Sequence, residues 1–78
     1  MYEYNICNVY DQEIFKKQCN AIEKHIPNLT KENLLDDVDG SQIQIYLING
    51  SSKIKVINDK MIGIEVHSDE ELTKYFKR

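Results

Sequence analysis

Three aspartates crowd into four positions of the sequence, Asp36, Asp37 and Asp39, immediately before Gly40. Carboxylates beside a glycine are typical of calcium loops, where about six to eight oxygens surround the ion at a sharp turn. With Gly40 at the sixth position of such a loop, Asp37 and Asp39 fit the third and fifth positions. The first and twelfth positions, however, are Leu35 and Tyr46, which cannot supply the required carboxylates. We therefore expect no calcium site, and the acidic corner is either a solvated turn or a charged patch that recognises a partner.

Two histidines, His25 and His67, and two cysteines, Cys7 and Cys19, could also bind metal or attack a substrate. Neither histidine has a cysteine or carboxylate at a spacing such as C-x-x-C or H-E-x-x-H, and the three glycines are isolated, so no phosphate loop is present. We expect both thiols to be reduced and buried. The sequence thus predicts no metal, no cofactor, no catalytic residue and no enzyme activity.

The composition predicts a small globular domain with a modest acidic excess. The 78 residues are 41% apolar and 29% charged, with a net charge of −3, which suits one domain without a deep cleft. Residues 1–39 hold 8 acidic side chains against 4 lysines, whereas residues 40–78 hold 5 against 6 basic ones. Excess acid repels phosphates, so nucleic acid is a disfavoured partner. The N-terminus lacks the pattern of a signal peptide and no apolar run could span a membrane, so we expect a cytoplasmic protein.

The first half of the chain predicts an extended segment followed by two helices. Alternating tyrosines favour a strand within residues 2–10. Asp11 is a good N-cap, and apolar residues recur on one face of a helix over 12–26, which must end before the single proline. A short second helix over 31–36 follows, because Thr30 can cap it.

The second half predicts a three-stranded antiparallel meander and a last helix. We expect these alternating residues to face the core: Ile43, Ile45, Leu47, Ile54, Val56, Ile62, Ile64 and Val66. The first hairpin, at the Asn-Gly pair 49–50, then needs a loop of two or four residues, and the second needs an odd loop, most simply 58–60. Gly63 indicates a bulge or a close backbone approach, and a capping box that starts at Ser68 predicts a helix over 69–77.

Together these elements predict an α+β two-layer sandwich. The N-terminal, short second and C-terminal helices lie on one face of the meander, with a possible fourth strand from residues 2–10. The outer face is predicted to carry a mixture of Gln44, Tyr46, Ile48, Lys55, Ile57 and Glu65. Apolar groups rimmed by polar ones are typical of interfaces, unless the N-terminal segment folds over this face.

The order of helix, three-stranded meander and helix resembles the topology of double-stranded RNA-binding domains. Those domains carry a basic cluster at the start of the last helix, where this chain has Asp69, Glu70 and Glu71, so RNA binding there is electrostatically opposed. The same order with acidic charge resembles small phage-encoded inhibitors of bacterial defence nucleases. This second resemblance implies a protein that binds another protein.

We therefore expect a non-enzymatic protein-binding module, such as an inhibitor, antitoxin, immunity or anti-defence protein of a bacterium or phage, acting on a basic protein partner, of which a nucleic-acid-binding protein is one example. Its binding residues are predicted to be Glu32, Asp36, Asp37, Asp39, Tyr46, Ile48, Lys55, Ile57 and Glu65. One alternative is a homo-oligomeric structural or regulatory protein, such as a homodimer, that uses the outer face. The other is a nucleic-acid-binding domain that uses the basic second half. Its cations would be Lys53, Lys55, Lys60, Lys74, Lys77 and Arg78.

Overall fold

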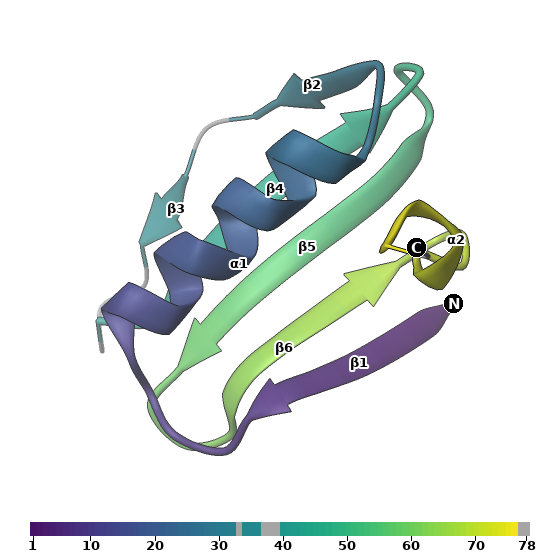
Figure 1. The fold of residues 1–78 in the computed structure, drawn as a ribbon. Coiled ribbons are helices and arrows are strands. Elements are labelled where there is room, and N and C mark those ends of the chain that lie inside the picture. The colour runs from purple at the N-terminus through teal and green to yellow at the C-terminus, as the bar shows by residue number, and fades with distance from the viewer. Residues whose placement is uncertain (33, 37–39, 77–78) are drawn as a thin grey trace.

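The structure is a computed structural model that describes residues 1–32, 34–36 and 40–76. These residues form β1 (Tyr2–Cys7), α1 (Gln12–His25), β2 (Leu29–Lys31), β3 (Leu35–Asp36), β4 (Gln42–Ile48), β5 (Ser52–Asp59), β6 (Gly63–Ser68) and α2 (Thr73–Phe76). The strands make one antiparallel sheet in the order β1-β6-β5-β4-β2, and β3 also pairs with β4 (Figure 1). The predicted α+β class with an antiparallel sheet is confirmed, but the strands and helices differ in number and arrangement.

Helix α1 forms where the sequence predicts it. The carboxylate of Asp11 accepts hydrogen bonds from the backbone N–H groups of Glu13 at 2.9 Å and Ile14 at 3.1 Å, as an N-cap does. The helix ends at Ile26, whose backbone is extended because a proline follows it. Its buried stripe consists of Phe15, Cys19 and Ile22.

The β4–β5 hairpin turns on the predicted Asn49-Gly50 pair, but its loop has three residues instead of two or four. Both residues have positive φ, 53° and 74°, and the Ser51 N–H donates to the Ile48 carbonyl. The ladder resumes with Ile48 opposite Ser52, so residues of the same parity face one another across the hairpin. The expected even loop was therefore wrong.

This register decides which side of β4 is buried. Tyr46 pairs with Ile54 and is fully buried, whereas Ile43, Ile45 and Leu47 point to the other side and are only partly buried. The prediction that those three residues face the core was wrong. The pattern was ambiguous because β4 is apolar at both odd and even positions. A loop longer or shorter by one residue exchanges the side chains that face the core with those that face away from it.

The sequence predicts a second helix over 31–36, but the described residues of this segment include the end of β2 and both residues of β3 and form no helix. Thr30 pairs with Leu47 in the β2–β4 ladder, and the Glu32 N–H donates to the Ile45 carbonyl at 2.8 Å. β3 then pairs Leu35 with Ile43. β4 would otherwise present a free edge, and the backbone hydrogen bonds it offers outweigh the weak local preference of a short helix. Residues 33 and 37–39 lie outside the described part of the chain.

The β5–β6 hairpin has the odd loop that the sequence predicts, but two residues further along the chain. Asp59 pairs with Gly63, which leaves residues 60–62 as the loop instead of 58–60. Ile62 consequently lies in the turn, where 47% of its surface is exposed. The prediction that Ile62 belongs to the core was wrong.

β1 extends the sheet beyond β6 and does not cover the outer face. Its register shifts between Asn5 and Cys7, where a bulge forms. At this point Gly63 has a φ of +90°, and a Cβ there would overlap the Cys7 carbonyl oxygen. The close backbone approach predicted at this glycine is confirmed, and the approaching chain is the end of the predicted N-terminal strand.

The last helix begins later than the predicted residue 69 because Asp69 is still held by the sheet. Residue 77, where the helix was predicted to end, lies outside the described part of the chain. The Asp69 N–H donates to the Lys53 carbonyl at 3.0 Å, and its carboxylate accepts from the Lys53 N–H at 3.0 Å. The Ser68 hydroxyl donates to the Glu70 carbonyl at 2.6 Å, so the expected capping box does not form. The helix begins only at Thr73.

Both helices pack on one face of the sheet, which we call the covered face; the opposite side is the open face. The rings of His25 in α1 and Phe76 in α2 lie 5.1 Å apart, which places α2 beside the end of α1. The core between the layers consists of Phe15, Cys19, Ile22, Ile26, Tyr46, Ile48, Ile54, Val56, Ile64, Val66 and Leu72. Neither helix within the described residues is long and apolar enough to cross a membrane.

Candidate functional site

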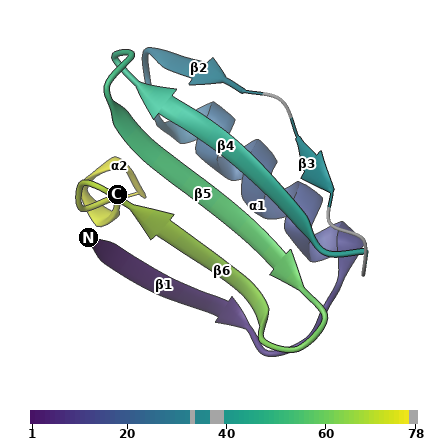
Figure 2. The ribbon, with the colours of Figure 1, turned by 180° about the vertical axis from the view of Figure 1, so that it is seen from behind.

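The open face carries side chains in bands that follow the strand order, and Figure 2 shows this face with the sheet in front of α1. The alternation of each strand assigns the residues to it. From β4 to β1 they are Ile43, Ile45, Leu47, Lys53, Lys55, Ile57, Asp59, Glu65, His67, Glu3 and Asn5. An apolar band on β4 is therefore followed by a mixed band on β5, with two lysines, an isoleucine and an aspartate, and by a band on β6 and β1 that contains two glutamates.

We define the open-face cluster as Ile43, Ile45, Leu47 and Ile57. The first three are successive outward positions of β4, and Ile57 pairs with Ile43 across the ladder. Each is partly buried by its neighbours in the sheet. Within residues 1–32, 34–36 and 40–76, no helix or strand lies in front of this side of β4 and β5 (Figure 2). Contiguous aliphatic surface of this kind is typical of protein interfaces.

The structure brings only part of the predicted outer face together. Lys55, Ile57 and Glu65 lie on the open face and are partly buried, as expected. Tyr46 and Ile48 were expected beside them, but they are 0% and 2% exposed on the covered face. Their predicted placement was wrong because the three-residue loop turns β4 over, and no partner can reach them in this fold.

The acidic corner is described only in part. Glu32 is exposed, and its backbone carbonyl accepts a hydrogen bond of 2.6 Å from the Gln44 side chain. The sequence predicted Gln44 on the outer face, but the fold buries it. The backbone of Asp36 belongs to β3, opposite Gln42. The predictions for Asp37 and Asp39 concern residues outside the described part of the chain.

The described lysines of the second half do not gather on one surface. Lys53 and Lys55 lie on the open face. The Lys60 ammonium lies 5.7 Å from the centre of the Tyr10 ring, and that of Lys74 lies 3.3 Å from a carboxylate oxygen of Glu70. Electrostatic binding of nucleic acid needs several cations along one face. Lys77 and Arg78 lie outside the described part of the chain. The scatter of the four described lysines gives the nucleic-acid alternative no support.

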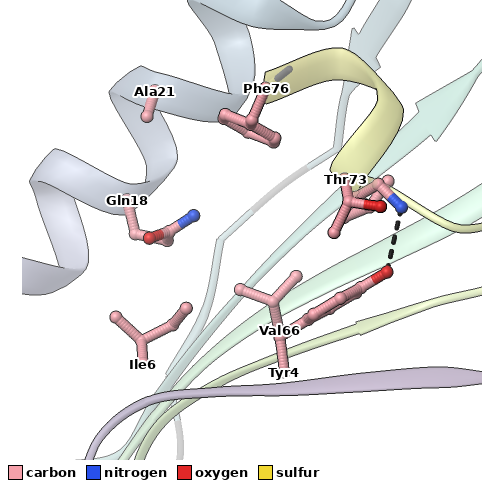
Figure 3. Close-up of a pocket in the computed structure, with 8 residues that line it drawn as sticks. Tyr4, Ile6, Gln18, Ala21, Val66, Thr73 and Phe76 are labelled. Carbon is pink, nitrogen blue, oxygen red and sulfur yellow. Dashed lines mark hydrogen bonds between the residues drawn. The ribbon is translucent and has the colours of Figure 1, made fainter. Parts of the chain in front are cut away.

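A groove of about 490 Å³ opens on the covered face between α1, α2 and the edge strand β1 (Figure 3). Its lining includes Tyr4, Ile6, Gln18, Ala21, Val66, Thr73 and Phe76. The Tyr4 hydroxyl accepts a hydrogen bond from the Leu72 N–H at 3.0 Å, and the Thr73 hydroxyl donates to Glu71 at 2.6 Å. None of the described residues that line the groove is a carboxylate, lysine, histidine or cysteine, so the groove offers apolar contact and no acid or base pair.

A second hollow, of about 410 Å³, lies between α1 and β2. The Tyr46 hydroxyl donates to a Glu23 carboxylate oxygen at 2.6 Å, and the Lys31 ammonium lies 3.5 Å from the same oxygen. Burial and this hydrogen bond raise the pKa of the Tyr46 phenol above its ordinary range. Burial also raises the pKa of the neighbouring Cys19 thiol. Both groups therefore stay protonated, and a protonated thiol is a weak nucleophile.

Both cysteines are free thiols, but only Cys19 is buried as expected, whereas Cys7 is partly buried. Sequence reasoning missed Ile43, Ile45 and Leu47 of β4 as site residues, because it predicted that they face the core. The signal was present, because Gln42–Ile48 alternates less regularly than β5 and places apolar residues on both sides. Such a strand is typical of a sheet that is covered on both faces.

Comparison of the chain with protein-family models, with curated protein sequences and with solved structures returned no significant match.

Proposed function

We propose that this protein is a non-enzymatic protein-binding module and that its partner covers the open-face cluster. The observation that carries this proposal is the double-sided apolar character of β4. Tyr46 and Ile48 fill the core on one side, while the cluster on the other side has no covering layer in the described chain. Burying aliphatic surface yields about 25 cal/mol per Å², so an uncovered cluster favours association with another apolar surface.

The charges beside the cluster indicate the chemistry of the partner. Lys55 pairs with Ile45 and Lys53 with Leu47, so the band next to the cluster is positive and suits acidic groups of the partner. The net charge of −3 and the acidic corner of residues 36–39 suit a basic surface elsewhere on the same partner. A nucleic-acid-binding protein carries a basic surface of this kind. An inhibitor, antitoxin, immunity or anti-defence protein that acts on it would need acidic groups to match that surface.

A matched pair of variants tests the cluster. Ile45→Glu places a charge in the open-face cluster, whereas Met61→Glu makes the same kind of change at a turn residue that is 90% exposed. A partner captured from the native host with the wild-type protein is purified and titrated against all three forms. We expect binding to weaken by roughly tenfold or more for Ile45→Glu and to stay within about twofold for Met61→Glu. Equal affinity for all three forms would overturn the proposal.

The acidic corner is tested separately by reversing Asp36, Asp37 and Asp39 to lysine. If these carboxylates steer a basic partner, the association rate should fall and should depend less on salt concentration. An unchanged rate would limit the interface to the cluster itself.

A second copy of this chain is the other candidate partner. The outward row of β4 is uniformly aliphatic, and a two-fold axis beside β4 would set this row against itself. Sedimentation velocity over a range of concentrations distinguishes the two cases. A dimer that Ile45→Glu abolishes and Met61→Glu leaves intact would assign the open-face cluster to self-association. A monomer at all concentrations would exclude a second copy of the chain as the partner.

A further inference from the structure

We propose that Glu3, Glu65 and His67 form a binding site for a divalent transition metal ion, represented by Zn²⁺. One oxygen of each carboxylate and a ring nitrogen of the histidine all lie within 4.8 Å of one another. Bonds of about 2 Å place the ligands of a tetrahedral zinc ion roughly 3.3 Å apart. Small side-chain rotations therefore suffice to close the three groups around an ion.

The sheet itself positions these three side chains. Glu3 pairs directly with His67 across the β1–β6 ladder, and Glu65 lies two residues before His67, so all three project from the open face. The His67 Nε2 atom is already 2.9 Å from a Glu65 carboxylate oxygen. Asn5, which pairs with Glu65, places an amide on the same face. The side chains of His67 and Glu65 are 23% and 26% exposed, so an ion and its water ligands can reach them.

Apart from His67, the two carboxylates have no basic partner in the described part of the chain. Among the described residues, no lysine or arginine lies within ion-pair distance of Glu3 or Glu65. Two carboxylates that face the same point attract a cation, whose charge is opposite to theirs. A divalent ion supplies that charge and takes its third ligand from His67.

Neighbouring charges reduce the affinity of this site without blocking it. Lys55 pairs with His67 from the β5 side, and Lys53, Asp69 and the N-terminal residue line a small hollow beside the ring. The two ammonium groups repel a divalent ion, and Asp69 attracts it. Replacing Lys55 by glutamine should therefore strengthen metal binding, which a structural role of the cluster would not predict.

The ligand set selects the class of ion. One imidazole and two carboxylates suit Zn²⁺, Co²⁺ or Mn²⁺, whereas Ca²⁺ needs about six to eight oxygens. Glu3 lies on the edge strand and His67 on its neighbour, so a bound ion would link β1 to β6. The three metal ligands include no residue of the open-face cluster.

Titration calorimetry of the 78-residue protein with Zn²⁺, and with Mg²⁺ as a comparison ion, tests the proposal. We expect saturable one-to-one binding of Zn²⁺ that weakens by roughly tenfold or more in Glu3→Gln and in His67→Gln. Glu13→Gln and His25→Gln are the matched controls, since both residues are exposed on α1, and they should bind within about twofold of the wild type. Lys55→Gln should bind about two- to threefold more tightly.

Cobalt absorption identifies the ligands, because the free thiols Cys7 and Cys19 are the competing donors. The Co²⁺ spectrum should lack the intense near-ultraviolet band of a thiolate ligand, and Mn²⁺ should broaden the amide resonances of β1 and β6 first. Absence of saturable Zn²⁺ binding, a thiolate band, or wild-type affinity in both Glu3→Gln and His67→Gln would each overturn the proposal. Glu3 is exposed on an edge strand, so its variant should stay folded even if the His67 variant does not.

Discussion

The covered and open faces of the sheet differ in what lies over them more than in how apolar they are. On β4 and β5, the covered face contributes Tyr46, Ile48, Ile54 and Val56 to the core. The open face of the same two strands carries an aliphatic cluster of similar size, flanked by lysines. A strand pattern therefore reports how apolar each side is, and only the packing of α1 shows which side this chain buries by itself.

Polar groups behave differently on the two faces. On the covered face, the fully buried Asn58 accepts a hydrogen bond of 3.1 Å from the Asp11 N–H and so ties the start of α1 to β5. On the open face, Lys55 and Glu65 are only partly buried and can contact a partner, although Glu65 also contacts His67. Buried polar groups thus specify the internal packing, whereas the open-face charges are available for recognition.

The largest effect is expected from Gly63→Ala, which disturbs both faces at once. A Cβ at this position would overlap the backbone of Cys7 and Asn8, and φ is +90°. We expect the free energy of unfolding to fall by about 3 kcal/mol or more. Gly50→Ala is the control, because φ is +74° but no atom lies within 4 Å, and it should cost only about 1 kcal/mol. Chemical denaturation gives both values, and equal losses would refute the close approach of β1.

Truncating the covered face should cost more than any truncation of the open face. Ile54 is 0% exposed and lies opposite Tyr46, so Ile54→Ala leaves a cavity under α1. We expect a loss of about 3 kcal/mol in the free energy of unfolding, measured by urea denaturation. A loss below about 1 kcal/mol would mean that α1 does not pack on this face as described.

Tyr46→Phe removes the hydrogen bond to Glu23 while keeping the ring in the core. We expect a loss of about 1 kcal/mol at neutral pH. Because the folded state raises the pKa of this phenol, wild-type stability should decline as pH rises above about 10, where the unfolded tyrosine ionises. The variant should lose less stability over that range. Parallel pH curves for the two proteins would contradict a buried, hydrogen-bonded phenol.

The smallest effect is expected on the open face. Ile57→Ala should lower the free energy of unfolding of the isolated protein by about 1 kcal/mol or less, because the side chain has no layer above it. Val56→Ala, one residue earlier and 0% exposed, should cost about twice as much. Thermal and urea unfolding of the two variants compare the faces directly. If Ile57→Ala proves as costly as Val56→Ala, the open face is already covered by another copy of the chain.

Local signals predicted several elements well. The cap at Asp11, the apolar stripe and the proline predict α1 to within one residue, since all of this information lies within a few turns of the chain. Asn49 and Gly50 predict the turn because few other pairs tolerate positive φ at both positions. The open-face site was predicted only for Lys55, Ile57 and Glu65, which depend on the regular alternation of β5 and β6.

The sequence by itself determined the α+β class, the first helix, the hairpins and the acidic balance, because each follows from local periodicity, turn chemistry or composition. Only the tertiary structure decided which side of β4 is buried, since apolar residues stand on both sides and one loop residue reverses them. It also decided that residues 29–31 pair as a strand and that Glu3 meets His67, because both depend on contacts between distant segments. Such pairings are selected by the free edges of the assembled sheet, which no local pattern records.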